Sequence, residues 1–314
     1  MSIASTALLS ACSESVTDSA PGPSDDVAPT RELEPSVVTD VPDAEVLLAT
    51  LAATREVLAA CSSVAETSSR RLRRICAVIT EQHDVLVRLI DAGGLDVQER
   101  TTATSVPGDD DASTADIDAE MTIATMLAKQ STGAGIVDTL ATVSPTNLPT
   151  LLALHGQRAA AAEILGGPVK WPVVEGPLGP GAITVLAGLR QAVYGFEVLA
   201  SRSTEKERQT YTEALRPLRE ASRTVTELAG PAAPVAPLGY GLPSGVENRD
   251  ARRQLAKDLL AALPQAVIAG SAARAGDQDA IAGTVRLMSL SVRLGTIFRV
   301  PAAPFPGLRV PADP

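Results

Sequence analysis

The chain shows a helical hydrophobic repeat through most of its length after residue 42. Apolar side chains recur every three or four residues, a spacing that places them on one face of an α-helix. Together with Gly, Pro and N-cap signals, this repeat predicts helices at 43–66, 69–92, 116–143, 147–166, 180–202, 204–229, 247–275 and 277–299. No convincing run alternates polar residues with β-branched or aromatic ones, as strands prefer. The pattern therefore predicts an all-α protein, with "STGAG" (131–135) as a potential break in the third helix.

The connections divide these helices into two sets of four. Each set has two helix pairs joined by short turns, with one long connection between the pairs, at 93–115 and at 230–245. A Gly- and Pro-rich stretch at 166–181 separates the sets, and Trp171 within it is expected to pin this connection to a bundle surface. One long crossover is a connectivity of ferritin-like four-helix bundles. The sequence thus predicts two tandem ferritin-like bundles, at 43–166 and 180–308.

The first two predicted helices each carry a row of residues expected to face the core, which we call a seam. The two seams predict how these helices pair. Both seams alternate steps of four and three residues, as packed helices do: Leu47, Leu51, Thr54, Leu58, Cys61, Ala65, and then Leu72, Cys76, Ile79, His83, Leu86, Ile90. Antiparallel pairing places Cys61 opposite Cys76 and Thr54 opposite His83. Two interpretations of the cysteines stay open. They form a disulfide, which needs an oxidising compartment, or they are two buried free thiols.

Composition and charge narrow the class of protein. Apolar residues make up 45% of the chain but aromatic residues only 2%, so the core is built mainly from small and aliphatic side chains that suit close-packed helices. The net charge of −10 is concentrated in two segments. Residues 13–45 hold nine acidic side chains and one Arg. Residues 99–120 hold seven acidic side chains and one Arg. The rest is close to neutral and lacks the clustered basic face that nucleic-acid binding requires.

The N-terminus carries a candidate lipid-attachment site. The stretch "LLSAC", ending at Cys12, resembles the bacterial lipobox. We expect residues 1–12 to be a truncated lipoprotein signal segment whose basic end is encoded upstream. Residues 13–42 are acidic and Pro-rich, a composition typical of a disordered spacer. These features predict an extracytoplasmic protein anchored to the cell membrane by a lipid at Cys12.

Two motifs of the C-terminal half resemble a known family. "AVYGFEVLASR" (192–202) and "PAAPFPGL" (301–308) are similar to a ferritin-like domain of uncharacterised function found in lipoproteins of high-GC Gram-positive bacteria. The resemblance covers about 180–308 and implies a ferritin-like fold in a cell-envelope lipoprotein. In that family a Glu-His pair precedes the "AVY" segment, whereas Leu189 and Arg190 stand here. The resemblance therefore does not extend to this inward metal ligand.

The two histidines of the chain are the remaining candidate ligands. A di-iron site needs Glu-x-x-His on two helices, and neither histidine follows a Glu by three residues, so no cofactor is predicted. His83, on the seam, has two interpretations. It is a buried imidazole bonded to Thr54, or it binds a single Zn or Cu ion with His155 and either Glu81 or Glu163.

No motif of nucleophilic catalysis is present, because neither histidine belongs to a recognisable acid–base set and no Gly-x-Ser-x-Gly elbow occurs. The sequence predicts a non-catalytic binding or interaction module rather than an enzyme. Its expected partners are the membrane, through the lipid at Cys12, and either an envelope protein or a small apolar ligand. The alternative is a ferritin-like metal-binding or metal-storage protein that uses His83 and His155.

Overall fold

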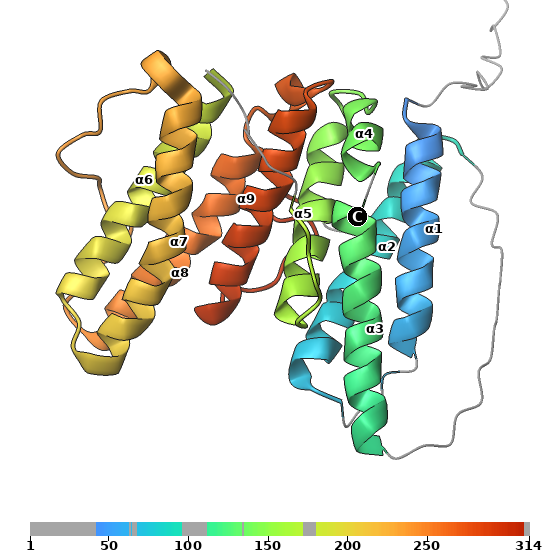
Figure 1. Ribbon diagram of the computed structural model, residues 1–314, viewed down its shortest axis with the longest axis horizontal. Coiled ribbons are helices and arrows are strands. Elements are labelled where there is room, and N and C mark those ends of the chain that lie inside the picture. The colour runs from blue at the N-terminus through green and yellow to red at the C-terminus, as the bar shows by residue number, and fades with distance from the viewer. Residues whose placement is uncertain are drawn as a thin grey trace, which may run out of the picture. The chain divides into compact units, whose positions relative to one another are not determined.

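The computed structural model of the chain describes residues 42–62, 64, 68–95, 112–133, 135–171 and 180–310. All regular secondary structure in these ranges is helical, which confirms the predicted all-α class. Figure 1 shows the helices. They are α1 (Ala44–Ser62), α2 (Arg70–Ala92), α3 (Ala112–Thr132), α4 (Ile136–Ala141), α5 (Leu148–Ile164), α6 (Pro180–Ser201), α7 (Glu205–Ala229), α8 (Arg249–Ile268) and α9 (Gln278–Ile297), with short 3₁₀ helices η1 (Gly230–Ala232) and η2 (Ser271–Arg274).

Two of the predicted helices are interrupted at glycines. The third predicted segment divides into α3 and α4 around Gly135, whose φ is 85°. The seventh ends at Ile268, and Gly270, with φ 67°, leads into η2. Both glycines adopt the left-handed conformation that other residues avoid, so the chain turns there although the hydrophobic repeat continues. The other predicted helices agree with the structure to within a few residues at their ends.

Helix α5 lies between two other helices and is buried on every side from Leu151 to Ala162. It packs against α3 on one side and α9 on the other. A Cβ added to Gly156 of α5 would lie 2.4 Å from Cγ of Met288 in α9, so only glycine permits this approach. Helix α6 packs on α7 and α8. A Cβ at Gly195 of α6 would meet Cδ1 of Leu259 at 2.2 Å.

The larger hydrophobic core includes side chains from α1 and α2 and from every helix between α4 and α9. The closing segment "PAAPFPGL" packs onto it. Phe305 is buried, and Gly307 comes so near α8 that a Cβ would lie 2.5 Å from the carbonyl oxygen of Pro264. The side-chain amide of Gln82 in α2 donates to the carbonyl of Pro304 at 2.9 Å. The closing segment and the α5–α9 contact thus join helices on both sides of the boundary predicted between 166 and 180.

A disulfide joins α1 to α2. Cys61 and Cys76 are bonded, and their Cα atoms are 5.7 Å apart. The structure therefore favours the first of the two interpretations drawn from the seams. The Leu47, Leu51, Leu86 and Ile90 side chains of the same hairpin are buried, as the seams predict.

One helix in the described residues is apolar and long enough to meet the length and hydropathy criteria for a membrane span. This stretch, Gly181–Ser201, makes up most of α6. Its Leu186, Leu189 and Phe196 side chains are buried in the core, as expected for a helix that packs inside a bundle. Leu189 is, like the other two, deeply buried.

Candidate functional site

A polar cluster occupies the interior between α1, α2, α3 and α5. Its centre is Arg158 of α5, whose side chain is fully buried. The guanidinium donates from Nε to Oε1 of Gln82 (3.1 Å), from Nη1 to Oε1 of Gln130 (3.4 Å) and from Nη2 to Oγ1 of Thr54. These three acceptors lie on three different helices and are all neutral. Burial without a bonded carboxylate lowers the pKa of Arg158 to about 9.

His155 lies one helical turn before Arg158 and is also buried. Burial lowers the pKa of His155 to about 3, and the positive charge of Arg158 contributes to the decrease. The imidazole is therefore neutral at pH 7, and its Nδ1 has no hydrogen-bond partner. Neutral imidazole is a metal ligand, but the neighbouring cation opposes a second positive charge. The described residues contain no group of three or more His, Cys, Asp or Glu side chains placed to hold a metal ion.

His83 does not occupy the position that the seam predicts. Its side chain is 25% exposed, and Nδ1 lies 3.1 Å from Oδ1 of Asp84. Gln82 takes the buried place and donates from Nε2 to Oε1 of Gln157 at 3.1 Å. The expected bond between His83 and Thr54 is therefore wrong, because Thr54 accepts from Arg158 instead. The rest of the predicted α2 seam is largely kept, since Leu72, Ile79, Leu86 and Ile90 are buried, and the difference is local: Ile75 and Gln82 are buried in place of Cys76 and His83.

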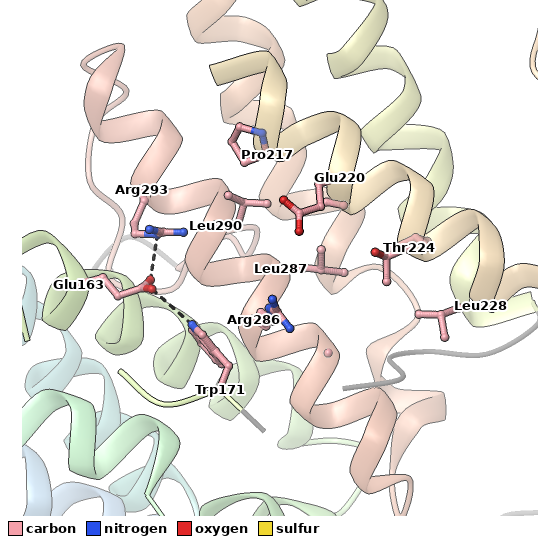
Figure 2. Close-up of a pocket in the computed structure, with 13 residues that line it drawn as sticks. Glu163, Trp171, Pro217, Glu220, Thr224, Leu228, Arg286, Leu287, Leu290 and Arg293 are labelled. Atoms are coloured by element: carbon pink, nitrogen blue, oxygen red, sulfur yellow. Dashed lines mark hydrogen bonds and ion pairs between the residues drawn. The ribbon is translucent and has the colours of Figure 1, made fainter. Parts of the chain in front are cut away.

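Glu163, near the end of α5, has three donors around its carboxylate. Nε of Arg293 lies 2.8 Å from Oε2, Oγ of Ser289 lies 2.7 Å from Oε2, and Nε1 of Trp171 lies 3.3 Å from Oε1. Figure 2 shows Arg293 and Trp171 approaching this carboxylate from two sides. Trp171 thus pins the chain after α5 against a helix surface, as expected. Glu81 is exposed on α2. Glu81, His83, His155 and Glu163 accordingly have separate surroundings.

A groove lies beside Glu163, between α7 and α9, with a volume of about 250 Å³. We name it the α7–α9 groove. Its floor is apolar and its rim carries charged and polar side chains (Figure 2). The floor is formed by Ala221, Val225, Leu228, Leu287 and Leu290, and the rim by Glu163, Trp171, Glu220, Thr224, Arg286 and Arg293.

Two rim residues are free to meet a ligand. Arg286 on α9 and Glu220 on α7 are exposed. Neither side chain has a hydrogen bond or ion pair within the ranges that the structure describes. The groove therefore offers an apolar floor together with one unpaired charge of each sign.

The groove arises from the way α7 and α9 find their neighbours. Helix α7 packs on α6, whereas α9 packs on α5 and α8. The α7 side chains that line this space include the compact Pro217, Ala221 and Val225. Pro217 has no backbone N–H, so the carbonyl of Glu213 one turn earlier loses its helical donor. Helix periodicity predicts each helix but not the space between two helices that are distant in sequence, so the groove was not predicted.

The lipid-attachment prediction concerns residues that the structure does not describe. Cys12, the signal segment and the spacer all lie before residue 42, outside the described residues. They stay predictions.

Comparison with known proteins adds no assignment. No protein-family model, no curated protein and no solved structure matches the chain. The interpretation of the groove consequently rests on its own geometry.

Proposed function

We propose that this protein is a non-catalytic binding module that holds a small amphipathic ligand in the α7–α9 groove. The observation that carries this proposal is the combination of an apolar floor with the unpaired Arg286 and Glu220 at the rim. Ligand sites in proteins typically pair an apolar lining with a few polar groups that fix orientation. An apolar body on Leu287 and Leu290 and a polar head at the rim would match this arrangement.

The chemistry around the groove supports binding rather than catalysis. Glu163 is the most enclosed carboxylate of the rim, and it accepts hydrogen bonds from Trp171 and Ser289 and forms an ion pair with Arg293. These contacts tie the Glu163 carboxylate to its own protein neighbours, so it is not free to contact a ligand in the groove. Its role is to hold Trp171 and Arg293 in place at one end of the groove.

The compartment proposed for this module is extracytoplasmic. The disulfide between Cys61 and Cys76 supports it, because such bonds persist in oxidising environments. The lipobox-like stretch before Cys12 supports anchoring to the membrane as a lipoprotein. Metabolic labelling with a fatty acid tests this directly. We expect the label on the wild-type protein in the membrane fraction and none on Cys12→Ala. Unlabelled wild-type protein would contradict the proposed anchor.

The fold proposed for the module is a pair of ferritin-like bundles without di-iron ligands. The packing of α1 on α2 and α3, of α3 on α5, and of α6 on α7 and α8 supports this grouping, and the contact of α9 with α5 then joins the two bundles. The centre of the first group holds Arg158 where a metal-binding bundle would hold inward carboxylates. Because His83 bonds to Asp84 near the surface and His155 is buried beside Arg158, we prefer ligand binding to the metal-storage alternative.

The single tryptophan of the chain gives this proposal a built-in reporter. Trp171 lines the groove, so ligand binding there should change its fluorescence. We would titrate the full chain with decanoate, decylamine and decyl maltoside, each below its critical micelle concentration. At least one of these amphiphiles should give a saturable change in emission, and the preferred head group reports whether Arg286 or Glu220 dominates recognition.

Matched variants separate groove binding from non-specific adsorption. Leu287→Asp places a charge on the apolar floor and should abolish saturation, whereas Leu89→Asp, on an exposed site of α2, should bind as the wild type does. Far-UV circular dichroism would confirm that both variants are folded. Absence of saturable binding by all three amphiphiles, or equal binding by folded Leu287→Asp, would refute the proposed function.

A further inference from the structure

The connection between α7 and α8 contains an extended proline segment, residues 233–243, which we name the proline strap. Pro234 and Pro237 are three residues apart, the repeat of a polyproline II helix. Each proline fixes its own φ and forces the preceding residue into an extended conformation. Ala233, which precedes Pro234, has φ −59° and ψ 120°. The strap has no regular hydrogen-bonded structure over 233–237 and forms the orange loop at the left of Figure 1.

The strap carries the two most exposed large apolar side chains in the described part of the chain. Val235 is 94% exposed and Leu238 is 108% exposed. They are also three residues apart, the spacing that a polyproline II helix places on one edge. No Asp, Glu, Lys or Arg occurs between residues 230 and 245. The strap therefore presents a neutral surface of proline rings and aliphatic side chains to solvent.

Contacts from α6 hold the strap in place at both ends. Nη1 of Arg190 donates to the carbonyl of Pro234 at 2.6 Å, and Nε2 of Gln191 donates to the carbonyl of Gly241 at 3.2 Å. The ring of Tyr240 packs at 5.7 Å from that of Tyr194. These contacts fix the backbone while Val235 and Leu238 stay uncovered. A segment that is already extended loses little conformational entropy when a partner binds.

We propose that the proline strap is a docking site for a partner protein whose binding groove is lined by aromatic rings. Such grooves recognise Pro-x-x-Pro segments by stacking rings against the prolines and enclosing the residues between and after them. Pro234 and Pro237 supply the rings, and Val235 and Leu238 supply the apolar side chains. The absence of charge in the strap fits an aromatic, neutral groove better than a charged surface.

This surface is separate from the α7–α9 groove. None of the residues that line the groove belongs to the strap. The two proposals therefore fail or succeed independently, and a strap variant should leave the Trp171 titration unchanged.

The test uses purified domains that have aromatic Pro-x-x-Pro grooves. Isotope-labelled SH3, WW and EVH1 domains would each be titrated with the full chain and followed by NMR. We expect at least one domain to show saturable shifts confined to its aromatic groove. The double variant Val235→Ser/Leu238→Ser should weaken that binding by tenfold or more, because it removes the apolar side chains that the groove encloses.

The control removes two exposed apolar side chains elsewhere. Leu48 and Leu89 are each 39% exposed, and Leu48→Ser/Leu89→Ser should change the affinity by less than twofold. Failure of every domain to bind the wild type, or unchanged binding by the strap variant, would overturn the proposal. Analytical ultracentrifugation gives a further outcome that would overturn the proposal: the wild-type chain associates with itself and the strap variant does not. The strap would then bind a second copy of this chain.

Discussion

The interiors of the two halves of the protein are built from different chemistry. Between α1, α2, α3 and α5 the interior combines a small aliphatic cluster with a polar network, in which Arg158 is bonded to Thr54, Gln82 and Gln130. Between α6, α7 and α9 it is aromatic. The ring of Phe196 lies 6.1 Å from that of Tyr211 and 5.3 Å from that of Phe298, and the last two rings stack at 5.7 Å.

The distribution of aromatic residues explains this difference. Every Phe, Tyr and Trp lies after residue 170, namely Trp171, Tyr194, Phe196, Tyr211, Tyr240, Phe298 and Phe305. The second half can therefore fill its centre with large rings that bury much apolar area. The first half has only aliphatic and small side chains, and it combines them with a directional hydrogen-bond network and a disulfide. We infer that burial of apolar surface is the main source of stability in the second half. In the first half, the hydrogen bonds around Arg158 fix how the helices pack against one another.

The largest effect is expected from the aromatic centre. Phe196→Ala should lower the free energy of unfolding by about 3–5 kcal/mol, because it removes a fully buried ring and leaves a cavity. Chemical denaturation followed by circular dichroism measures this change. Tyr194→Ala, at a partly exposed site, should have a smaller effect. Equal losses at the two positions would contradict an aromatic centre that depends on burial.

Loss of the disulfide should give the next largest decrease in the free energy of unfolding. This bond joins two helices of the first half. It closes a loop with a sequence separation of 15 residues, for which the chain-entropy estimate is about 3 kcal/mol. Adding a reductant should lower the free energy of unfolding of the wild type by this amount. Cys61→Ala/Cys76→Ala should be insensitive to the reductant. A wild type that is equally stable with and without reductant would show that the disulfide does not stabilise the α1–α2 hairpin.

The geometry of the polar centre is tested by a substitution that keeps a basic side chain but removes the guanidinium fork. Arg158→Lys should lower the free energy of unfolding by about 2 kcal/mol or more. An ammonium cannot reach all three acceptors, and each buried oxygen without a donor costs about 1 kcal/mol. Arg286→Lys, at an exposed site, should stay within about 0.5 kcal/mol of the wild type. Full stability of Arg158→Lys would mean that a basic side chain, not bond geometry, is what the first centre requires.

The smallest effect is a pH dependence from His155. The unfolded chain takes up a proton near pH 6.5, whereas the buried imidazole takes one up only near pH 3. Stability therefore falls as the pH drops below 6.5, by about 1 kcal/mol between pH 6.5 and pH 5.5. Denaturation at these two pH values should show a smaller decrease in His155→Gln. An identical pH profile for the variant would place the responsible group elsewhere.

The sequence predicted the helices and the juxtaposition of the two cysteines because both depend on local spacing, while it left a disulfide and two free thiols as alternatives. It placed Cys61 opposite Cys76 correctly, yet it put His83 rather than Gln82 inside. Steps of three and of four residues both keep a side chain on the same face of a helix, so the apolar positions around them fit either Gln82 or His83 as the buried residue. Arg158 was missed because charged residues normally lie outside, and nothing in "LLALHGQRAAAAEIL" (151–165) shows that α5 is enclosed on all sides. The α7–α9 groove was missed because its two walls are distant in sequence.

Hydrogen–deuterium exchange of the full chain, with and without a saturating amphiphile, most directly tests the proposed role of the α7–α9 groove. We predict slower exchange in peptides that cover 217–228 of α7 and 283–293 of α9, with no change in α1 or α2. Protection confined to α1 and α2, or no protection anywhere despite saturation, would contradict the account.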